Sequence, residues 1–124
     1  MAKQKTILFL EDEEELLNTV GLLLREQGYN VIEANLGEDA LKIAQQTNLD
    51  LILADIKLPG IDGFDFFKEV RKFEHCKKVP FVFLTAFNNM KAAVGAKKDG
   101  AAEYITKPFD FEYLVLRIKE LVPL

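Results

Sequence analysis

The chain has 124 residues, of which 49% are hydrophobic and 29% are charged, a balance typical of one globular domain. Its net charge of −4 argues against nucleic-acid binding, because surfaces of that kind gather lysine and arginine against phosphates. A single cysteine excludes an internal disulfide, and the apolar run near the N-terminus is too short for a secretion signal or a membrane span. We therefore expect a single domain over residues 1–124, located in the cytoplasm and not in a membrane.

Five apolar runs of strand length alternate with helical patterns along the chain. The runs cover residues 6–10, 31–34, 49–55, 79–85 and 102–106. Several are almost continuously hydrophobic, which is typical of parallel strands covered on both faces. The strict alternation of strand and helix predicts an α/β fold in which helices pack on both faces of one parallel sheet.

Between these runs, apolar residues recur at the spacing of a helix face. The first such stripe ends at Gly28, a natural C-terminal cap, and comprises Leu16, Leu17, Val20, Leu23 and Leu24. Residues 37–46 and 88–100 predict two short helices, the second weakened by Gly95 and therefore expected to be mobile. A third stripe comprises Phe66, Phe67, Val70 and Phe73. The last begins behind Asp110 as N-cap and comprises Phe111, Leu114, Val115, Ile118 and Leu121.

Polar side chains gather where the predicted strands end, which is where open α/β sheets bind ligands. Glu11 and Asp12 follow the first strand, Asp55 ends the third, Thr85 ends the fourth, and Lys107 follows the fifth. Carboxylate and hydroxyl oxygens suit a hard cation such as Mg²⁺, and the lysine leaves a positive charge for an anion such as a phosphoryl group. Neighbouring carboxylates repel one another without a counter-ion, so we expect the cluster to hold a bound cation.

Some of these residues also fit ordinary structural roles. The acids at 13–15 are explained by favourable charge at the positive end of a helix dipole. Thr85 alone would suit any strand, and Lys107 alone would suit any surface. His75 and Cys76 lie in the polar stretch "EHCKK" without further residues at metal-ligand spacing, which predicts an exposed loop.

Four ordered motifs resemble those of the receiver domains of bacterial two-component response regulators, and the resemblance covers essentially the whole chain. The motifs are "ILFLEDEEEL", "LILADIKLPGIDGF", "VPFVFLTA" and "GAAEYITKPF". The resemblance implies a flavodoxin-like (βα)5 fold with a doubly wound, five-stranded parallel sheet of strand order 2-1-3-4-5.

By position, Asp55 resembles the aspartate that accepts a phosphoryl group from a sensor histidine kinase or a phosphotransfer protein. Asp12 resembles a direct Mg²⁺ ligand, Glu11 resembles the acid that acts through a water on the metal, and Lys57 resembles the residue whose backbone carbonyl completes the protein ligands. Lys107 would pair with a phosphoryl oxygen.

The resemblance also implies a switch. Thr85 would turn to hydrogen-bond the phosphoryl group and Tyr104 would follow it inward, while the bond from Lys107 to Pro108 is expected to be cis. The Lys57 side chain and Phe87 occupy positions that tune how fast phosphate is lost.

The output is expected on the face formed by the fourth helix, the fifth strand and the fifth helix, where an unknown downstream protein would bind. Dimerising relatives place opposite charges on this face. Asp99, Glu103 and Arg117 supply part of such a set, but Ala93 and Tyr113 stand where charged partners are expected. We therefore expect the protein to be mostly monomeric.

Three other functions fit the same fold class. A flavodoxin-like cofactor-binding protein is disfavoured, because the first strand leads into acids rather than a phosphate-cradling loop. A phosphatase with an aspartyl-phosphate intermediate is disfavoured because "DIKLPG" lacks a second acid two residues after Asp55, so we do not expect a multiple-turnover enzyme. A receiver-like module that works without phosphorylation is the remaining alternative, and the presence of all the key residues argues against it.

Overall fold

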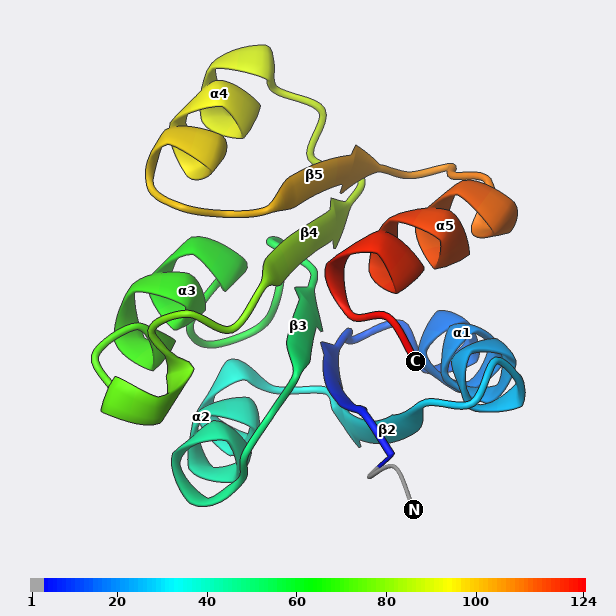
Figure 1. Ribbon diagram of the computed structural model, residues 1–124. Helices are drawn as coiled ribbons and strands as arrows, with labels where there is room; N and C mark the ends of the chain where they lie inside the picture. Colours follow the sequence, from blue (N-terminus) through cyan, green and yellow to red (C-terminus); the bar gives the residue numbers. More distant parts are fainter. Residues whose placement is uncertain (1–3) are drawn as a thin grey trace.

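The computed structural model describes residues 4–124, which form one five-stranded parallel sheet. The strands are β1 (Thr6–Leu10), β2 (Asn30–Ala34), β3 (Leu51–Ala54), β4 (Phe81–Thr85) and β5 (Glu103–Thr106). Their order across the sheet is β2-β1-β3-β4-β5, and every adjacent pair is parallel (Figure 1). The predicted α/β fold and strand order are confirmed.

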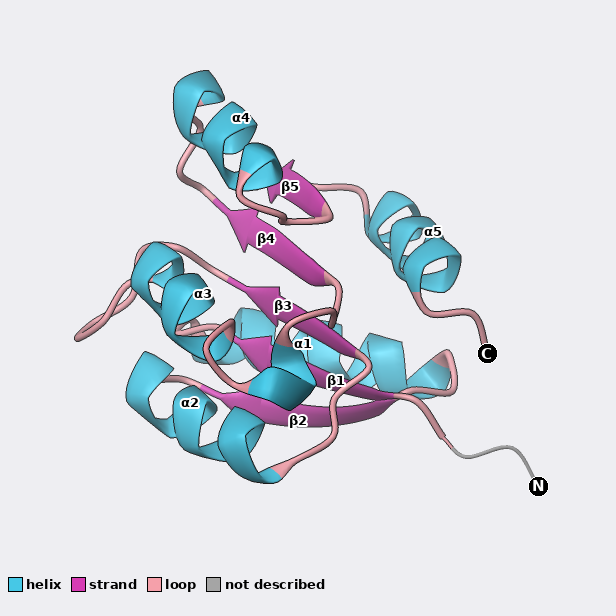
Figure 2. Cartoon of the chain, turned by 60° about the vertical axis from the view of Figure 1, so that its left-hand side comes forward, coloured by secondary structure: helices cyan, strands magenta, loops and turns pink. Residues whose placement is uncertain are grey.

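Helices cover both faces of this sheet. They are α1 (Glu14–Glu26), α2 (Gly37–Gln46), α3 (Gly63–Val70), α4 (Met90–Lys98) and α5 (Phe111–Leu121). Side chains of α1 and α5 pack into one core cluster, and those of α2, α3 and α4 pack into the other. Figure 2 shows the two helical layers with the strands between them. Within residues 4–124, no helix is long and apolar enough to cross a membrane.

The central strands are buried on both faces, as their unbroken apolar runs predict. Every residue of β3 and β4 is buried, and so are four of the five residues of β1. The predicted runs at 49–55 and 79–85 each begin two residues before the observed strand. Asp50 and Pro80, just before the two strands, still make backbone hydrogen bonds with neighbouring strands, to Thr6 at 2.8 Å and from Ile52 at 2.9 Å.

The helix ends follow the expected local chemistry. α1 ends just before Gly28, which has a φ of +103°, a conformation that residues with a Cβ rarely adopt. The Asp110 carboxylate caps α5 by accepting from the backbone N–H of Glu112 at 2.9 Å. The Asn89 side chain caps α4 in the same way, accepting from Ala92 at 3.0 Å.

The segment after α3 differs from the prediction. Phe73 lies beyond the helix, which ends at Val70, and a short 3-10 helix follows at Glu74–Cys76. The expected exposed loop is wrong for Cys76, which is fully buried in the core beneath α2. The chain folds back onto the end of α2 here, and the His75 ring nitrogen lies 2.7 Å from the carbonyl oxygen of Ala44.

Candidate functional site

The register of the sheet brings the first and third strand ends together. Leu10, the last residue of β1, pairs with Ala34 on one side and with Ala54 on the other. The backbone N–H of Asp55 donates to the carbonyl of Leu10 at 3.0 Å, and that of Glu11 donates to Ala34 at 3.0 Å. The sheet hydrogen bonding thus continues one residue past the strands and fixes the backbone of both acids at this edge.

Three carboxylates meet at this edge. One oxygen from each of Glu11, Asp12 and Asp55 lies within 4.8 Å of the other two. Glu11 is fully buried, Asp55 is nearly so, and Asp12 is exposed. Oxygen donors of this kind, open to solvent on one side, fit a hard divalent cation that retains water, as Mg²⁺ does.

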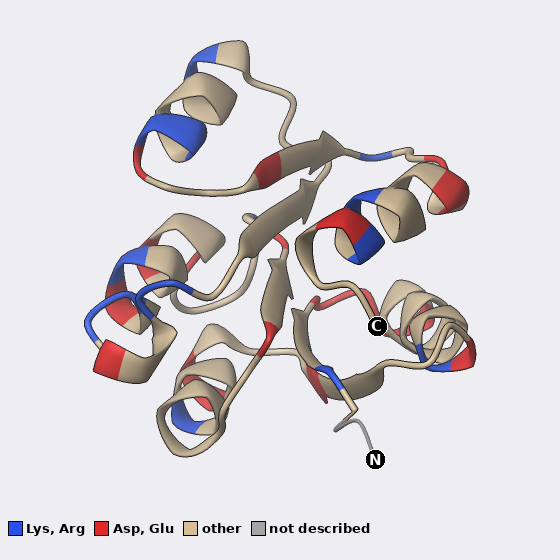
Figure 3. Ribbon diagram, in the orientation of Figure 1, with Lys and Arg blue, Asp and Glu red and all other residues tan. Residues whose placement is uncertain are grey.

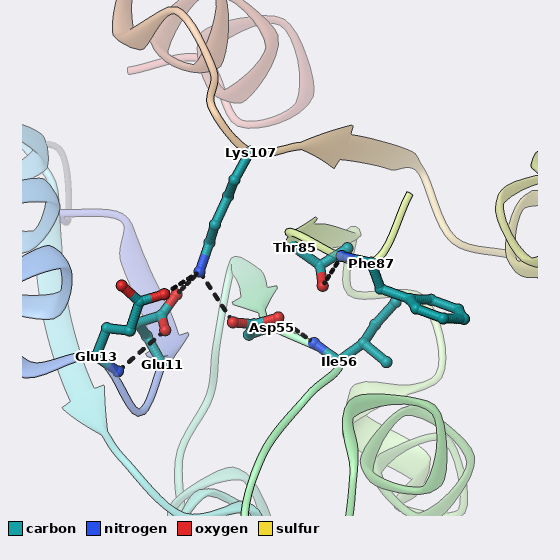
Figure 4. Close-up of polar contacts among 7 residues, drawn as sticks. All are labelled: Glu11, Glu13, Asp55, Ile56, Thr85, Phe87 and Lys107. Carbon is teal, nitrogen blue, oxygen red and sulfur yellow. Dashed lines mark hydrogen bonds and ion pairs between the residues drawn. The ribbon is translucent and has the colours of Figure 1, made fainter. Parts of the chain in front are cut away.

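Lys107 supplies a counter-charge from the chain itself. Its Nζ lies 2.7 Å from Glu11 Oε1, 2.9 Å from Asp55 Oδ2 and 3.2 Å from Glu13 Oε1 (Figure 4). The side chain reaches these acids from the end of β5, where its backbone N–H donates to Thr85. The ammonium group therefore balances part of the charge of the carboxylates, and the expectation of a bound cation stays a prediction. Figure 3 shows the basic position after β5 and the acidic stretch after β1.

Burial and the ion pairs shift the ionisation of both partners. Burial raises the pKa of Glu11 from 4.5 to about 7, although the hydrogen bond from Lys107 acts in the opposite direction. Burial alone would lower the pKa of Lys107, but its hydrogen bonds to Glu11 and Asp55 outweigh that effect and raise it. Lys107 is therefore a permanent cation at neutral pH, whereas Glu11 can exchange a proton there.

Thr85 and Tyr104 meet at one backbone position. Thr85 is fully buried, and its Oγ1 accepts a hydrogen bond from the N–H of Phe87 at 3.1 Å. The Tyr104 hydroxyl donates to the carbonyl oxygen of Phe87 at 2.5 Å. The two predicted switch residues thus hold opposite sides of the same residue, so a rotation of Thr85 would disturb the segment to which Tyr104 is bonded.

The loop from β3 to α3 is closed tightly around Asp55. The Asp55 Oδ1 accepts from the N–H of Ile56 at 2.6 Å, and the N–H of Gly63 donates to the carbonyl of Ile56 at 2.8 Å. A Cβ at Gly63 would lie only 2.1 Å from the backbone oxygen of Asp55, so only glycine fits here. Within the loop, the Lys57 ammonium lies 4.6 Å from the centre of the Phe87 ring. The predicted effect of this pair on phosphate loss stays a prediction.

Sequence reasoning missed Glu13. The favourable charge at the positive end of the helix dipole explains Glu14 and Glu15, which lie in the first turn of α1. It does not fully explain the position of the Glu13 side chain. Glu13 occupies the N-cap position without a side-chain capping bond, and its carboxylate reaches Lys107 instead. The one available signal is that glutamate is not a favoured N-cap residue.

The predicted cis bond between Lys107 and Pro108 is present.

Comparisons with known proteins agree on the kind of domain. The model of the response regulator receiver domain matches residues 7–119. The chain is 36% identical over 118 residues to the transcriptional regulatory protein ZraR of Klebsiella oxytoca, covering 95% of this chain and 26% of ZraR. The chain spans about a quarter to about half the length of such curated relatives.

Solved structures show the same fold. The non-phosphorylated HemR receiver domain from Leptospira biflexa superposes with a TM-score of 0.90 at 32% identity, covering 98% of this chain and 96% of that one. The receiver domain of sensor histidine kinase PA1611 from Pseudomonas aeruginosa PAO1 has a TM-score of 0.87 at 28% identity, covering 98% of this chain and 100% of that one. The latter structure is described with a magnesium ion coordinated in its active-site cleft.

Proposed function

The chain belongs to the response regulator receiver domain family, and on that premise we propose that it is a signalling switch controlled by phosphorylation of Asp55. One observation carries the proposal: the nearly buried Asp55 carboxylate lies beside the acids that follow β1 and 2.9 Å from the Lys107 ammonium. A nucleophilic carboxylate beside a cation-binding cluster and a fixed positive charge is suited to receiving a phosphoryl group. Membership of this family sets aside the flavodoxin-like alternative.

The phosphoryl donor we propose is a phosphohistidine on a sensor histidine kinase or a phosphotransfer protein. The phosphorus–nitrogen bond of the donor breaks, and the imidazole leaves with the electron pair. A new bond forms between phosphorus and an Asp55 carboxylate oxygen. Lys107 then binds a phosphoryl oxygen, which requires a rearrangement of the contacts that its ammonium makes in this structure.

The cofactor we propose is Mg²⁺, held by Glu11, Asp12, Asp55 and the backbone carbonyl of Lys57. The cation would neutralise charge on the incoming phosphoryl group and align it with the attacking oxygen. The three clustered carboxylates support this assignment. With the cation bound, the chain would assist its own phosphorylation and dephosphorylation. It is not a multiple-turnover enzyme, because the phosphoryl group is transferred to its own residue Asp55 rather than to a separate substrate.

The signal is proposed to pass through Thr85 and Tyr104 to the face formed by α4, β5 and α5. Thr85 leaves Phe87 to bind the phosphoryl group, and the Phe87 segment and Tyr104 then adopt a second arrangement. That segment leads directly into α4. A downstream protein that binds this face would therefore distinguish the two states.

Charges on this face support the proposal of a mostly monomeric protein. Glu103 accepts from Arg117 at 3.0 Å and pairs with Lys97 at 3.0 Å, so one carboxylate links α4, β5 and α5. Charges engaged within one chain are less available for pairing with a second copy.

We further propose that the protein works in the cytoplasm, where its phosphodonors would be found.

Beryllofluoride, a mimic of the phosphoryl group, tests this function. Added with Mg²⁺, it is expected to shift the NMR signals of Thr85, Tyr104 and α4, and to leave the sedimentation coefficient that of a monomer. The Asp55→Ala variant is the matched control and should not respond. A response confined to other elements would refute the proposed face, and a tight dimer would refute the monomer. If the parent does not respond at all, the phosphorylation-independent module is favoured.

A further inference from the structure

The three carboxylates around Lys107 differ in their exposure to solvent. The Glu11 side chain is fully buried and that of Asp55 is 6% exposed, whereas that of Glu13 is 64% exposed. The Lys107 side chain itself is 12% exposed. The ammonium thus lies at the boundary between two buried acids and one acid at the surface. Figure 4 shows its contacts with the three carboxylates.

These three contacts use the full donor capacity of the ammonium. A lysine Nζ carries three hydrogens, and each of the three carboxylates accepts one of them. Phosphorylation turns the Asp55 carboxylate into an acyl phosphate whose charged oxygens lie farther out, so Lys107 must move to meet them, and Glu11 and Glu13 then compete with the phosphoryl group for its donors. The choice of the released group is therefore a step in forming the phosphorylated state.

Of the two glutamates, Glu13 costs less to release. An exposed ion pair contributes little because water replaces the lost partner, whereas a buried acid left without its partner is strongly unfavourable. Glu13 also lies outside the group of carboxylates that could share a cation, so a metal ion would not compensate it. Its backbone is held by a separate contact, because its N–H donates to Glu11 Oε2 at 3.1 Å.

We propose that Glu13 is a positioning residue for Lys107. In the resting state its carboxylate holds the ammonium at the mouth of the site, and it gives up that position to the phosphoryl oxygen when Asp55 is modified. This role rests on the proposed function of Asp55 and Lys107. Glu13 and the phosphoryl group thus compete for one donor, so removing the Glu13 carboxylate strengthens binding of a phosphoryl group.

The test is a titration of the chain with beryllofluoride at saturating Mg²⁺, with the half-saturating concentration as the readout. Glu13→Gln is expected to lower that concentration about three- to five-fold, which corresponds to about 0.6–1 kcal/mol. Glu14→Gln is the matched control, since it removes the same charge from the same helix end. Glu14 makes no ion pair with Lys107 among the described residues, so its change should stay below about twofold.

Two further variants separate direct contact from general charge. Glu13→Asp keeps the charge but is one methylene shorter, so it should bind beryllofluoride more tightly than the parent, as Glu13→Gln does. In a Lys107→Met background, Glu13→Gln should have no more effect than Glu14→Gln. Melting temperatures of the Glu13 variants should fall by no more than roughly 2–4 °C, as the loss of a contact of about 0.6–1 kcal/mol requires, whereas a larger fall would indicate a merely structural effect.

The proposal is overturned if Glu13→Gln binds beryllofluoride no more tightly than the parent. It is equally overturned if Glu14→Gln gives the same gain, or if the gain persists without Lys107. In each of these cases the parent still binds beryllofluoride, so the function of Asp55 stands. A parent that binds no beryllofluoride overturns the proposed function and this inference together.

Discussion

Replacing Gly63 by alanine tests how tightly the loop that carries Asp55 is closed. A Cβ at this position would lie 2.1 Å from the Asp55 carbonyl oxygen and 2.7 Å from the Ile56 Cα, both backbone atoms. An ordinary contact begins at 3.4 Å, so the oxygen or the helix must move by about 1.3 Å. That movement also strains the hydrogen bond from Gly63 to Ile56, which is 2.8 Å long.

The cost of Gly63→Ala follows from these two effects. Overpacking typically costs about 1–3 kcal/mol, and a weakened hydrogen bond adds roughly 1 kcal/mol. We therefore expect the free energy of unfolding to fall by about 2–4 kcal/mol. With an unfolding entropy of about 0.26 kcal/mol/K for 124 residues, the melting temperature should fall by roughly 8–15 °C.

Gly95→Ala is the matched control, because it adds the same methyl group where a Cβ would meet nothing within 4 Å. Gly95 lies inside α4, where alanine is favoured over glycine by about 0.5–1 kcal/mol, so this variant should melt roughly 2–4 °C higher. Thermal unfolding followed by circular dichroism measures both variants. A Gly63→Ala variant as stable as the parent, or equal shifts in the two variants, would refute the close approach at Asp55.

Three further predictions concern the site and its neighbouring charges. Mg²⁺ should raise the melting temperature of the parent by mass action but not that of Asp12→Ala; equal stabilisation of the two would contradict the metal assignment. Because the pKa of Glu11 is about 7 without metal, a proton competes with Mg²⁺, so the affinity for Mg²⁺ should fall about tenfold per pH unit below pH 7 and level off above it. A titration that gives the same affinity at pH 6 and pH 8 would contradict the burial effect. The pKa of Glu103 lies below its ordinary value of 4.5, since burial would raise it but hydrogen bonds from Lys97 and Arg117 outweigh burial. Its stabilisation is therefore present above pH 4.5 and is lost as the pH falls through the lowered pKa. Glu103→Gln should cost about 1–2 kcal/mol in urea unfolding at pH 7 and little in strong acid, whereas a cost independent of pH would contradict the ion pairs.

The sheet could be predicted because its sequence signal is local. Unbroken apolar runs such as residues 51–54 have few alternatives to a strand covered on both faces, and the acids that follow them must then lie at one edge. The same reasoning placed Glu11, Asp55 and Lys107 in one site. In this part of the chain, strand geometry alone brings distant residues together.

The contacts that depend on loop paths could not be predicted. Lys107 meets Glu13 across 94 residues of sequence, and nothing in either segment indicates how far the lysine extends. The polar residues around Cys76 in the sequence predict an exposed segment, yet the chain folds back onto α2 and buries the Cys76 thiol. Arg71 stabilises that path by donating to the carbonyls of Cys76 and Val79 at 2.7 Å, which is a tertiary effect rather than a local preference.

The most direct test of the central claim is to locate the phosphoryl group. The chain would be treated with acetyl phosphate and Mg²⁺ and then reduced with borohydride, which converts a phosphorylated aspartate into homoserine. Peptide mass spectrometry is expected to find one modified residue, at position 55, and none in the Asp55→Ala variant treated in parallel. Modification at another aspartate, equal labelling of Asp55→Ala, or no labelling of the folded parent would contradict the account.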